Sequence, residues 1–430
     1  MIYYSTRDKN NTASFKEAVI KGLASDGGLF VPEKVEKLPQ EFFDNIESMS
    51  VAEMATKVMK PYVGDEIPEE KLKSILEEVL SFDFPLVQVD EDKFALELFH
   101  GPTLAFKDVG AGFLARCLGY FADDSKKVTV LVATSGDTGS AVANGFYNVE
   151  GTEVVILYPS GKVSASQEKQ LTTYGGNITA LEVDGTFDDC QVMVKEAFQD
   201  KELNKQLNLS SANSINVARF LPQSLYYFIA LGQLIKGDKD VVVSVPSGNF
   251  GNILAGIYAK NMGLKVNKFV VSNNANDPVV DYLESGDFEK RPSIQTISNA
   301  MDIGNPSNFE RMLHLYPELE KMKEVVEGYS YSDKETLESI EDIYSRTSYL
   351  PDPHGAVAYL GLSEAMNDRK NTVGVFVETA HPAKFIETFT DSQKENLEIP
   401  ERLSKFMNKE KSAIKMDNNF ESFKKYLLSR

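Results

Sequence analysis

The chain has 430 residues, 42% of them hydrophobic, which is enough for a large core and predicts two or three domains. Its formal net charge of -19 at pH 7 argues against nucleic acid or an anionic membrane as a main partner. Two cysteines imply no disulfide framework, and neither a signal-peptide pattern nor a run of about 18 apolar residues is present. We therefore expect a soluble, cytoplasmic protein.

The N-terminal part, residues 1–85, is predicted to form a separate and mostly helical unit. Ser14 is a suitable N-cap for a helix that begins at Phe15 and ends near Gly22. The sequence Asp-Gly-Gly-Leu-Phe-Val-Pro over residues 26–32 predicts a turn into a short extended segment. Two amphipathic helices are expected over residues 50–59 and 68–80.

From residue 86 the pattern changes to strands that alternate with helices. Apolar runs of strand length occur at residues 128–133, 154–158, 178–183, 241–245, 269–271 and 373–377. Helical patterns separate them at residues 110–121, 141–147, 187–198 and 217–235. Continuous apolar strands alternating with helices predict an α/β fold with parallel sheets covered on both faces. In such folds ligands bind at the carboxyl ends of the strands, so the loops after these runs are where chemistry should be sought.

We place the domain boundaries where this alternation begins and stops. Residues 86–390 form the predicted α/β core, with a smaller inserted subdomain over roughly residues 125–215. Residues 391–430 form a C-terminal extension. Beyond Pro400 the chain is rich in Lys, Asn and Ser, which predicts that the extension lies on the surface.

A lysine in an apolar setting stands near the start of the core. Residues 96–108 read Leu-Glu-Leu-Phe-His-Gly-Pro-Thr-Leu-Ala-Phe-Lys-Asp, so Lys107 directly follows Ala105 and Phe106. Loss of hydration lowers the pKa of an ammonium group, and the neutral amine can form a Schiff base with an aldehyde such as pyridoxal phosphate (PLP). Most lysines beside a phenylalanine are nevertheless solvated surface residues. The loops further along the chain decide between these two interpretations.

The loop after the run at residues 241–245 has the composition of a phosphate cradle. It reads Pro-Ser-Gly-Asn-Phe-Gly-Asn over residues 246–252 and leads into a helical pattern over residues 253–262. Two glycines let the backbone approach an anion, and a helix N-terminus directs free N–H groups at it. The spacing matches neither a Walker loop nor a dinucleotide fingerprint. By itself, the loop is equally well interpreted as a plain strand-to-helix turn.

Two further loops offer hydroxyl and amide groups at strand ends. Residues 134–140, Thr-Ser-Gly-Asp-Thr-Gly-Ser, begin another helix and suit a carboxylate. Asp137 would repel an anion, so we expect it to cap the helix or to bond a cationic or hydroxyl group of a ligand. Thr379 follows the run at residues 373–377, where its hydroxyl can meet a ring nitrogen. His381 is either a general base or, more often for a His-Pro at a helix start, a structural residue.

These blocks together resemble the threonine synthase family. The resemblance rests on residues 99–108, 135–139, 247–252 and 378–382 and, in the N-terminal part, on residues 14–19 and 22–32. It covers nearly the whole chain, and the Lys107 block combined with the N-terminal block is specific to the family. The family belongs to the fold-type II PLP enzymes, as does the tryptophan synthase β-subunit. The resemblance therefore implies two parallel-sheet α/β domains with the active site between them.

The resemblance also implies a reaction and roles for individual residues. O-phospho-L-homoserine and water would give L-threonine and phosphate by γ-elimination and β-addition of water, with PLP as cofactor. Lys107 would bind PLP covalently and move protons, and Thr379 would hydrogen-bond the pyridine nitrogen and leave the ring neutral. The cofactor phosphate would lie on the backbone amides of Gly248, Asn249, Phe250, Gly251 and Asn252. The loop that receives the substrate carboxylate would consist of Ser135, Gly136, Asp137 and Thr138, with Asp137 bordering the phenolic oxygen of the cofactor.

The substrate phosphate needs a site of its own. Residues 160–167 and 213–219 each place a cation beside small hydroxyl or amide groups near a helix start. The predicted substrate contacts in these stretches are Lys162, Ser164, Ser214, Asn216 and Arg219. Alternatively, Lys162 is an ordinary surface lysine and Arg219 pairs with a carboxylate.

Three functions compete. The first is threonine synthase, and the second is another PLP lyase on the same scaffold, either a serine/threonine dehydratase or a phospho-lyase that makes 2-oxobutyrate. The third is a non-catalytic PLP or metabolite-binding protein. The predicted cations favour a phosphorylated substrate over the simple dehydratases. We expect a small-molecule substrate, no metal, no nucleic-acid or membrane partner, and a monomer or homodimer.

Overall fold

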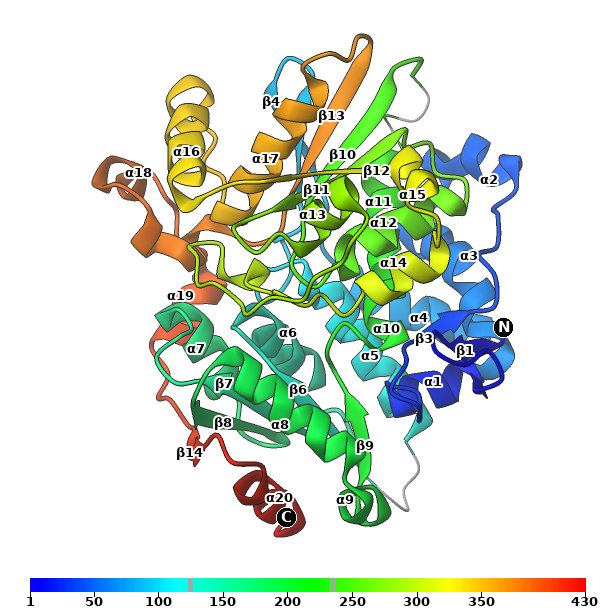
Figure 1. Cartoon of the computed structure of the whole chain (residues 1–430), viewed down its shortest axis with the longest axis vertical. Helices are drawn as coiled ribbons and strands as arrows, with labels where there is room; N and C mark the ends of the chain where they lie inside the picture. Colours follow the sequence, from blue (N-terminus) through cyan, green and yellow to red (C-terminus); the bar gives the residue numbers. More distant parts are fainter. Residues whose placement is uncertain (123–126, 233, 235–236) are drawn as a thin grey trace. The chain divides into compact units, whose positions relative to one another are not determined.

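The computed structural model of the chain describes residues 1–122, 127–232, 234 and 237–430 (Figure 1). Its contacts group the chain into two compact units. Unit 1 comprises Met1–Val31, Lys107–Arg219 and Ile399–Arg430, and unit 2 comprises Pro32–Phe106 and Phe220–Glu398. The domain boundaries near residues 85 and 390 stay predictions. No helix in these described ranges combines the length and the apolar character needed to cross a bilayer.

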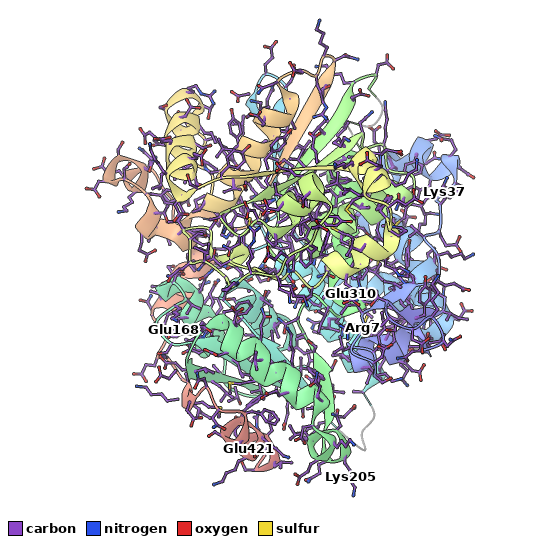
Figure 2. All side chains as sticks on the ribbon, viewed as in Figure 1. Arg7, Lys37, Glu168, Lys205, Glu310 and Glu421 are labelled. Atoms are coloured by element: carbon purple, nitrogen blue, oxygen red, sulfur yellow. The ribbon has the colours of Figure 1, made fainter. Side chains whose placement is uncertain are left out.

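Unit 1 is built on a parallel five-stranded sheet in the order β14-β8-β7-β6-β9. All six residues of β6 are buried, because strands pair with it on both sides and helices cover the sheet. Exposed charged residues such as Lys205 and Glu421 extend from the surface of the unit (Figure 2). The elements of this sheet layer are β6 (Val128–Ala133), α6 (Asp137–Phe146), β7 (Thr152–Pro159), α7 (Ala165–Thr172), β8 (Ile178–Asp184), α8 (Phe187–Gln199), α9 (Lys201–Gln206), β9 (Asn208–Ser211), α19 (Glu401–Met407), β14 (Ile414–Asp417) and α20 (Phe420–Leu428).

The N-terminal residues of unit 1 contain the predicted capped helix. Ser14 accepts a hydrogen bond from the Glu17 N–H, and the Glu17 carboxylate accepts one from the Ser14 N–H, so a capping box begins the helix. Gly22, with φ of 67°, ends it. A three-stranded sheet in the order β2-β1-β3 lies in the same part of the chain. The N-terminal elements are β1 (Tyr3–Ser5), β2 (Thr12–Ala13), α1 (Phe15–Lys21) and β3 (Phe30–Pro32). The later helix α5 (Lys107–Phe121) contacts α1.

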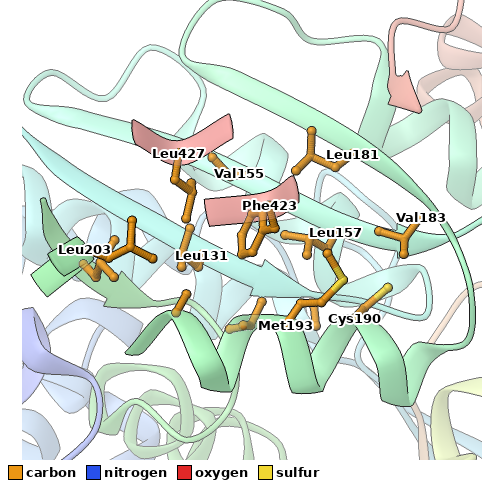
Figure 3. Packing of buried hydrophobic residues seen from close by; sticks show 14 residues of the cluster. Leu131, Val155, Leu157, Leu181, Val183, Cys190, Met193, Leu203, Phe423 and Leu427 are labelled. Carbon is orange, nitrogen blue, oxygen red and sulfur yellow. The ribbon is translucent and has the colours of Figure 1, made fainter. Parts of the chain in front are cut away.

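The C-terminal residues are part of the core of unit 1. The expectation that residues beyond Pro400 form a surface extension is wrong, because β14 pairs in parallel with β8 and α20 packs on α8. Phe423 and Leu427 are at most 1% exposed and lie against Leu131 and Leu157 (Figure 3). The overall composition beyond Pro400 hid an amphipathic helix, because the apolar residues of α20 recur at helical spacing.

Unit 2 is built on a six-stranded sheet in the order β12-β11-β10-β13-β5-β4. All neighbours are parallel except the edge pair β4 and β5. The helix α17 packs on β10, β11 and β13, where its apolar residues join the buried Val242, Val270 and Phe376. The strands are β4 (Leu86–Asp90), β5 (Lys93–Glu97), β10 (Asp240–Pro246), β11 (Lys268–Asn273), β12 (Val326–Ser330) and β13 (Thr372–Glu378).

Helices surround this sheet and form the rest of unit 2. They are α2 (Gln40–Asn45), α3 (Val51–Val63), α4 (Glu69–Val79), α11 (Ser224–Leu231), α12 (Gly251–Asn261), α13 (Pro278–Ser285), α14 (Phe309–Leu315), α15 (Leu319–Val325), α16 (Asp333–Thr347), α17 (Pro353–Met366) and α18 (Asp391–Glu395). Short 3-10 helices are η1 (Ile46–Ser48), η2 (Gly64–Glu66), η3 (Leu221–Gln223), η4 (Asn299–Met301) and η5 (Pro382–Thr388). One further helix, α10 (Val217–Phe220), ends across the boundary between the units.

The six predicted strands are confirmed as β6, β7, β8, β10, β11 and β13. The single helix predicted over residues 217–235 is wrong, because the structure has α10, η3 and α11 there and its helix ends at Leu231. Pro222 lacks an N–H group and interrupts the α-helical ladder. The predicted end at Ile235 lies outside the described residues.

Candidate functional site

In unit 2, the predicted phosphate cradle is a tight turn at the carboxyl end of β10. The Ser247 N–H donates to the Ser272 carbonyl over 3.0 Å, and Asn273 Nδ2 donates to the Ser247 carbonyl over 2.5 Å, so the turn is tied to β11. Phe250 has a φ of 62°, a left-handed conformation that is uncommon for a bulky residue. Such backbone strain is typical of functional turns.

The first turn of α12 presents polar hydrogens at this loop. The leading N–H groups of a helix have no acceptor within the helix. The Asn252 Oδ1 accepts hydrogen bonds from the hydroxyls of Tyr226 and Tyr227, over 2.7 and 2.6 Å, which fixes the orientation of the amide. Its Nδ2 is buried and has no hydrogen-bond partner in the described part of the chain. A buried donor of this kind is costly unless a ligand accepts a hydrogen bond from it, so the turn fits an anionic group such as a phosphate.

The back of the turn rests on the segment around η4. A Cβ atom at Gly248 would lie 2.8 Å from both the Ala300 carbonyl oxygen and the Met301 Cα, so only glycine fits there. The Asn249 side-chain oxygen accepts from the Ser307 N–H over 2.6 Å. The Asn249 side chain is therefore engaged within the protein.

Thr379 lies at the carboxyl end of β13, the parallel neighbour of β10. Its side chain is 6% exposed, and its carbonyl accepts from the Phe106 N–H over 2.9 Å. The His381 N–H donates to the Leu104 carbonyl over 3.0 Å, so residues 104–106 pair with the Thr379 loop. Unit 2 thus brings Thr379 and the Gly248 turn to neighbouring strand ends, and Lys107 directly follows the paired segment in the sequence.

Lys107 itself belongs to unit 1, where it is the first residue of α5 and partly buried. The predicted sites therefore form two groups, one in each unit. Gly248, Asn249, Phe250, Gly251, Asn252 and Thr379 are in unit 2, and Lys107 and the predicted substrate contacts are in unit 1.

In unit 1, three predicted loops follow neighbouring parallel strands. The loop of Ser135, Gly136, Asp137 and Thr138 follows β6, the loop with Lys162 and Ser164 follows β7, and the loop with Ser214 and Asn216 follows β9. All three therefore lie at the same edge of the sheet.

Gln167 connects the first two of these loops. Its Nε2 donates to Asp137 Oδ1 over 3.0 Å, and its Oε1 accepts from the Ser164 N–H over 3.1 Å. Gly136 has a φ of 137°, and a Cβ there would lie 2.4 Å from the Gln167 amide carbon. Ser164 is the N-cap of α7, and Asp137 is the first residue of α6. In the sequence, Gln167 was only the last residue of the predicted phosphate-binding stretch 160–167. Its position three residues after Ser164, the spacing of a capping box, was the signal that its side chain bonds the Ser164 backbone.

Asn216 and Arg219 are buried in unit 1, where their side chains bond backbone carbonyls. The Asn216 amide donates to the carbonyls of Val19 and Ser211, over 2.9 and 3.2 Å. Arg219 is 2% exposed and donates to the Ala212 carbonyl. Burial lowers the pKa of Arg219 to about 10 while Asp108 opposes the shift, so the guanidinium is charged at neutral pH. Lys162, by contrast, is exposed. Their contacts with a substrate stay predictions.

His381 makes a structural contact, and the choice between a general base and a structural residue stays a prediction. Its side chain caps η5, where Nδ1 accepts from the Ala383 N–H over 3.1 Å. A buried cluster that the sequence did not suggest lies near it, formed by Glu378, Asp352 and His354. No group of three or more His, Cys, Asp or Glu side chains suited to a metal occurs in the ranges that the structure describes.

Comparisons with known proteins cover the whole chain. Residues 86–378 match the family of pyridoxal-phosphate dependent enzymes, residues 2–80 match the threonine synthase N terminus, and residues 355–427 match the threonine synthase C-terminal family. A threonine synthase of Haemophilus influenzae is 42% identical over 429 residues, covering 100% of both chains. One of Escherichia coli is 43% identical over 406 residues, covering 94% of each.

Solved structures agree with these matches. The crystal structure of Escherichia coli threonine synthase superposes with a TM-score of 0.93 at 39% identity and covers 100% of both chains. The structure of PLP-bound threonine synthase from Brucella melitensis has a TM-score of 0.92 at 36% identity and covers 99% of this chain and 98% of its own. The predicted family, α/β fold-type II architecture and PLP cofactor are thereby confirmed.

Proposed function

Because the chain belongs to the threonine synthase family of PLP-dependent enzymes, we propose that it converts O-phospho-L-homoserine and water to L-threonine and phosphate. The single observation that best supports the cofactor site is the Asn252 Nδ2 atom, a buried donor with no partner among the described residues. It lies in the first turn of α12, beside the strand end that carries Thr379. A cofactor with a phosphate at one end and a ring nitrogen at the other matches these two neighbouring groups.

In this proposal each group of the cofactor site has a separate task. The backbone amides of residues 248–252 hold the phosphate, and they do so without a cationic side chain. The Thr379 hydroxyl donates to the pyridine nitrogen and leaves it uncharged. The Lys107 amine binds the cofactor covalently and afterwards holds or moves a proton at the substrate Cα. When bound, PLP supplies electron withdrawal from the substrate carbon.

We assign the loops of unit 1 to the substrate. Ser135, Gly136 and Thr138 offer hydroxyl and amide groups to the carboxylate, and Asp137, oriented by Gln167, borders the cofactor. The substrate phosphate is assigned to Lys162, Ser164, Ser214, Asn216 and Arg219. The Asn216 amide and the Arg219 guanidinium both bond backbone carbonyls, which supports a role in shaping this loop. The charged guanidinium of Arg219 also contributes positive charge to the proposed phosphate site.

The test is incubation with O-phospho-L-homoserine while free phosphate and threonine are followed together. Equal amounts of both products are expected. Phosphate release with 2-oxobutyrate in place of threonine would favour the competing phospho-lyase. Lys107→Ala should remove both turnover and the visible absorbance of lysine-bound PLP, and an active Lys107→Ala enzyme would refute the assignment of that amine.

A cytoplasmic location and a monomeric or homodimeric state also belong to this proposal. Light scattering of the purified holoenzyme at two concentrations measures the oligomeric state directly. A tetramer or larger assembly would contradict our expectation.

A further inference from the structure

A chain of buried polar groups in unit 2 lies behind both proposed cofactor loops. Glu378 and Asp352 are 0% exposed and His354 is 1% exposed. Glu378 ends β13, and the other two residues begin α17. Buried polar groups are costly unless they are hydrogen-bonded, and Glu378 Oε1 has no partner in the described part of the chain.

Asp352 is the centre of the cluster. Its Oδ1 accepts from the His354 backbone N–H over 2.8 Å and lies 2.5 Å from His354 Nδ1. Its Oδ2 accepts from the Ala380 N–H over 3.4 Å, and its own N–H donates to Glu378 Oε2 over 3.2 Å. Since Ala380 directly follows Thr379, Asp352 holds the backbone at the proposed ring-nitrogen contact.

His354 carries the connection to the other loop. Its Nε2 accepts from the Ala300 N–H over 3.2 Å. An acceptor at Nε2 requires the proton to be on Nδ1, where it is donated to Asp352. The backbone of Ala300 and Met301 is the surface on which Gly248 packs, 2.8 Å from the position of a Cβ there. The hydrogen bonds therefore run from the residue after Thr379 to the support of the phosphate turn.

Glu378 is the third residue of the cluster. Burial, followed by the charge of Asp352, raises the pKa of Glu378 well above its ordinary value. His354 Nδ1 donates to Asp352 Oδ1 and the Asp352 N–H donates to Glu378 Oε2, so Asp352 contacts both of the other residues. No group in the cluster needs to reach solvent or substrate.

We propose that Asp352 and His354 are positioning residues that couple the ring-nitrogen contact at Thr379 to the phosphate turn at Gly248. This inference rests on the proposed cofactor site and adds the residues that keep its two ends at a fixed separation. If these two residues only stabilised the N-terminus of α17, their substitution would not affect binding at one end of the cofactor more than at the other.

The test compares two substitutions of one histidine in the full-length chain after removal of PLP. The oxygen of a glutamine amide can replace the Nε2 acceptor, whereas an asparagine amide reaches Asp352 but leaves the Ala300 N–H without its acceptor. His354→Asn should weaken PLP binding roughly 10-fold, the effect of one lost buried hydrogen bond, and should leave the affinity for pyridoxal, which has no phosphate, unchanged. His354→Gln should restore PLP affinity at least in part. The phosphorus NMR resonance of bound PLP should move in His354→Asn and return in His354→Gln.

Leu362→Ala is the matched control, because Leu362 lies on the same helix, is buried in the apolar core and has no polar side-chain atom that could join the hydrogen bonds of the cluster. It should lower the melting temperature without changing the ratio of PLP to pyridoxal affinity. Equal weakening of both ligands in His354→Asn, or an unchanged PLP affinity, would overturn the proposal.

A second variant applies if His354→Asn does not fold. Asp352→Asn keeps the size of the N-cap but sets an amide N–H against either His354 Nδ1–H or the Ala380 N–H. Because Asp352 bonds the backbone beside Thr379 as well as His354, Asp352→Asn should lower the affinities for both PLP and pyridoxal, and an unchanged pyridoxal affinity would overturn the proposal. Because these readouts are ligand affinities, they are independent of whether the wild type forms threonine, which tests the proposed function separately.

Discussion

Replacing Gly355 by alanine probes the most crowded contact of the buried cluster. A Cβ atom at this position would lie 1.9 Å from Glu378 Oε1 and 2.2 Å from its carboxyl carbon. These separations are far inside van der Waals contact. Glu378 is fully buried, so its carboxyl group cannot swing into solvent.

The magnitude follows from three terms. Alanine in place of glycine within a helix contributes up to about 1 kcal/mol of stability. Overpacking of a close-packed interior costs about 1–3 kcal/mol. Displacement of the Glu378 carboxyl also breaks its hydrogen bond with the Asp352 N–H, which costs about 1 kcal/mol. We expect Gly355→Ala to lower the free energy of unfolding by about 1–3 kcal/mol.

The assay is urea denaturation of the wild type, Gly355→Ala, Glu378→Ala and the double variant. In the Glu378→Ala background the new methyl group has room, so Gly355→Ala should cost nothing there or stabilise the helix by up to about 1 kcal/mol. Gly237→Ala is the control, because the nearest atom to its Cβ is 3.5 Å away. A Gly355→Ala cost of the same size in both backgrounds would show that Glu378 is not the cause, and a stabilised single variant would refute the reasoning.

Three further predictions concern other parts of the chain. Asn252→Asp keeps the acceptor for the two tyrosine hydroxyls but places negative charge where Nδ2 was, so PLP affinity should fall at least roughly 10-fold in a fluorescence titration, and unchanged affinity would remove Asn252 from the phosphate site. Phe423→Ala should cost about 3–5 kcal/mol in thermal or urea unfolding because it empties part of the core of unit 1, whereas a cost below about 1 kcal/mol would contradict the packing of α20. Burial raises the pKa of Asp302 from 3.8 to about 6, so between these pH values the folded carboxyl keeps a proton that the unfolded chain has released. Its contribution to the free energy of unfolding therefore falls as pH rises through that window, by about 3 kcal/mol, and is constant above it. The difference between wild type and Asp302→Asn should follow this sign in urea denaturation, and a pH-independent difference would contradict it.

The local patterns of the sequence were sufficient for most of the secondary structure. The continuous apolar run at residues 128–133 coincides with β6, and Ser14 and Gly22 bound α1 as their capping preferences predict. The glycine-bearing turn after β10 and the position of Thr379 at a strand end also follow from residues adjacent in sequence. These features depend on interactions within about ten residues, which is the range over which propensity and periodicity act.

Other features depend on partners that are distant in sequence. The strand β9, reading Asn-Leu-Ser-Ser, has no apolar run and exists because β6 pairs with it. The final helix is a core element because Phe423 reaches α8 and β6. Neither partner is visible in the local composition.

The chemistry-bearing residues of this chain divide along the same line. The sequence determined which amine, which hydroxyl and which glycine-bearing turn are available, because each is recognisable from its immediate neighbours. Only the tertiary structure decided that Asp352 and His354 lie between β13 and η4, because burial and hydrogen bonding across a sheet are set by packing. The role of a buried polar group depends on the hydrogen-bond partners that replace water, and those partners come from distant parts of the chain.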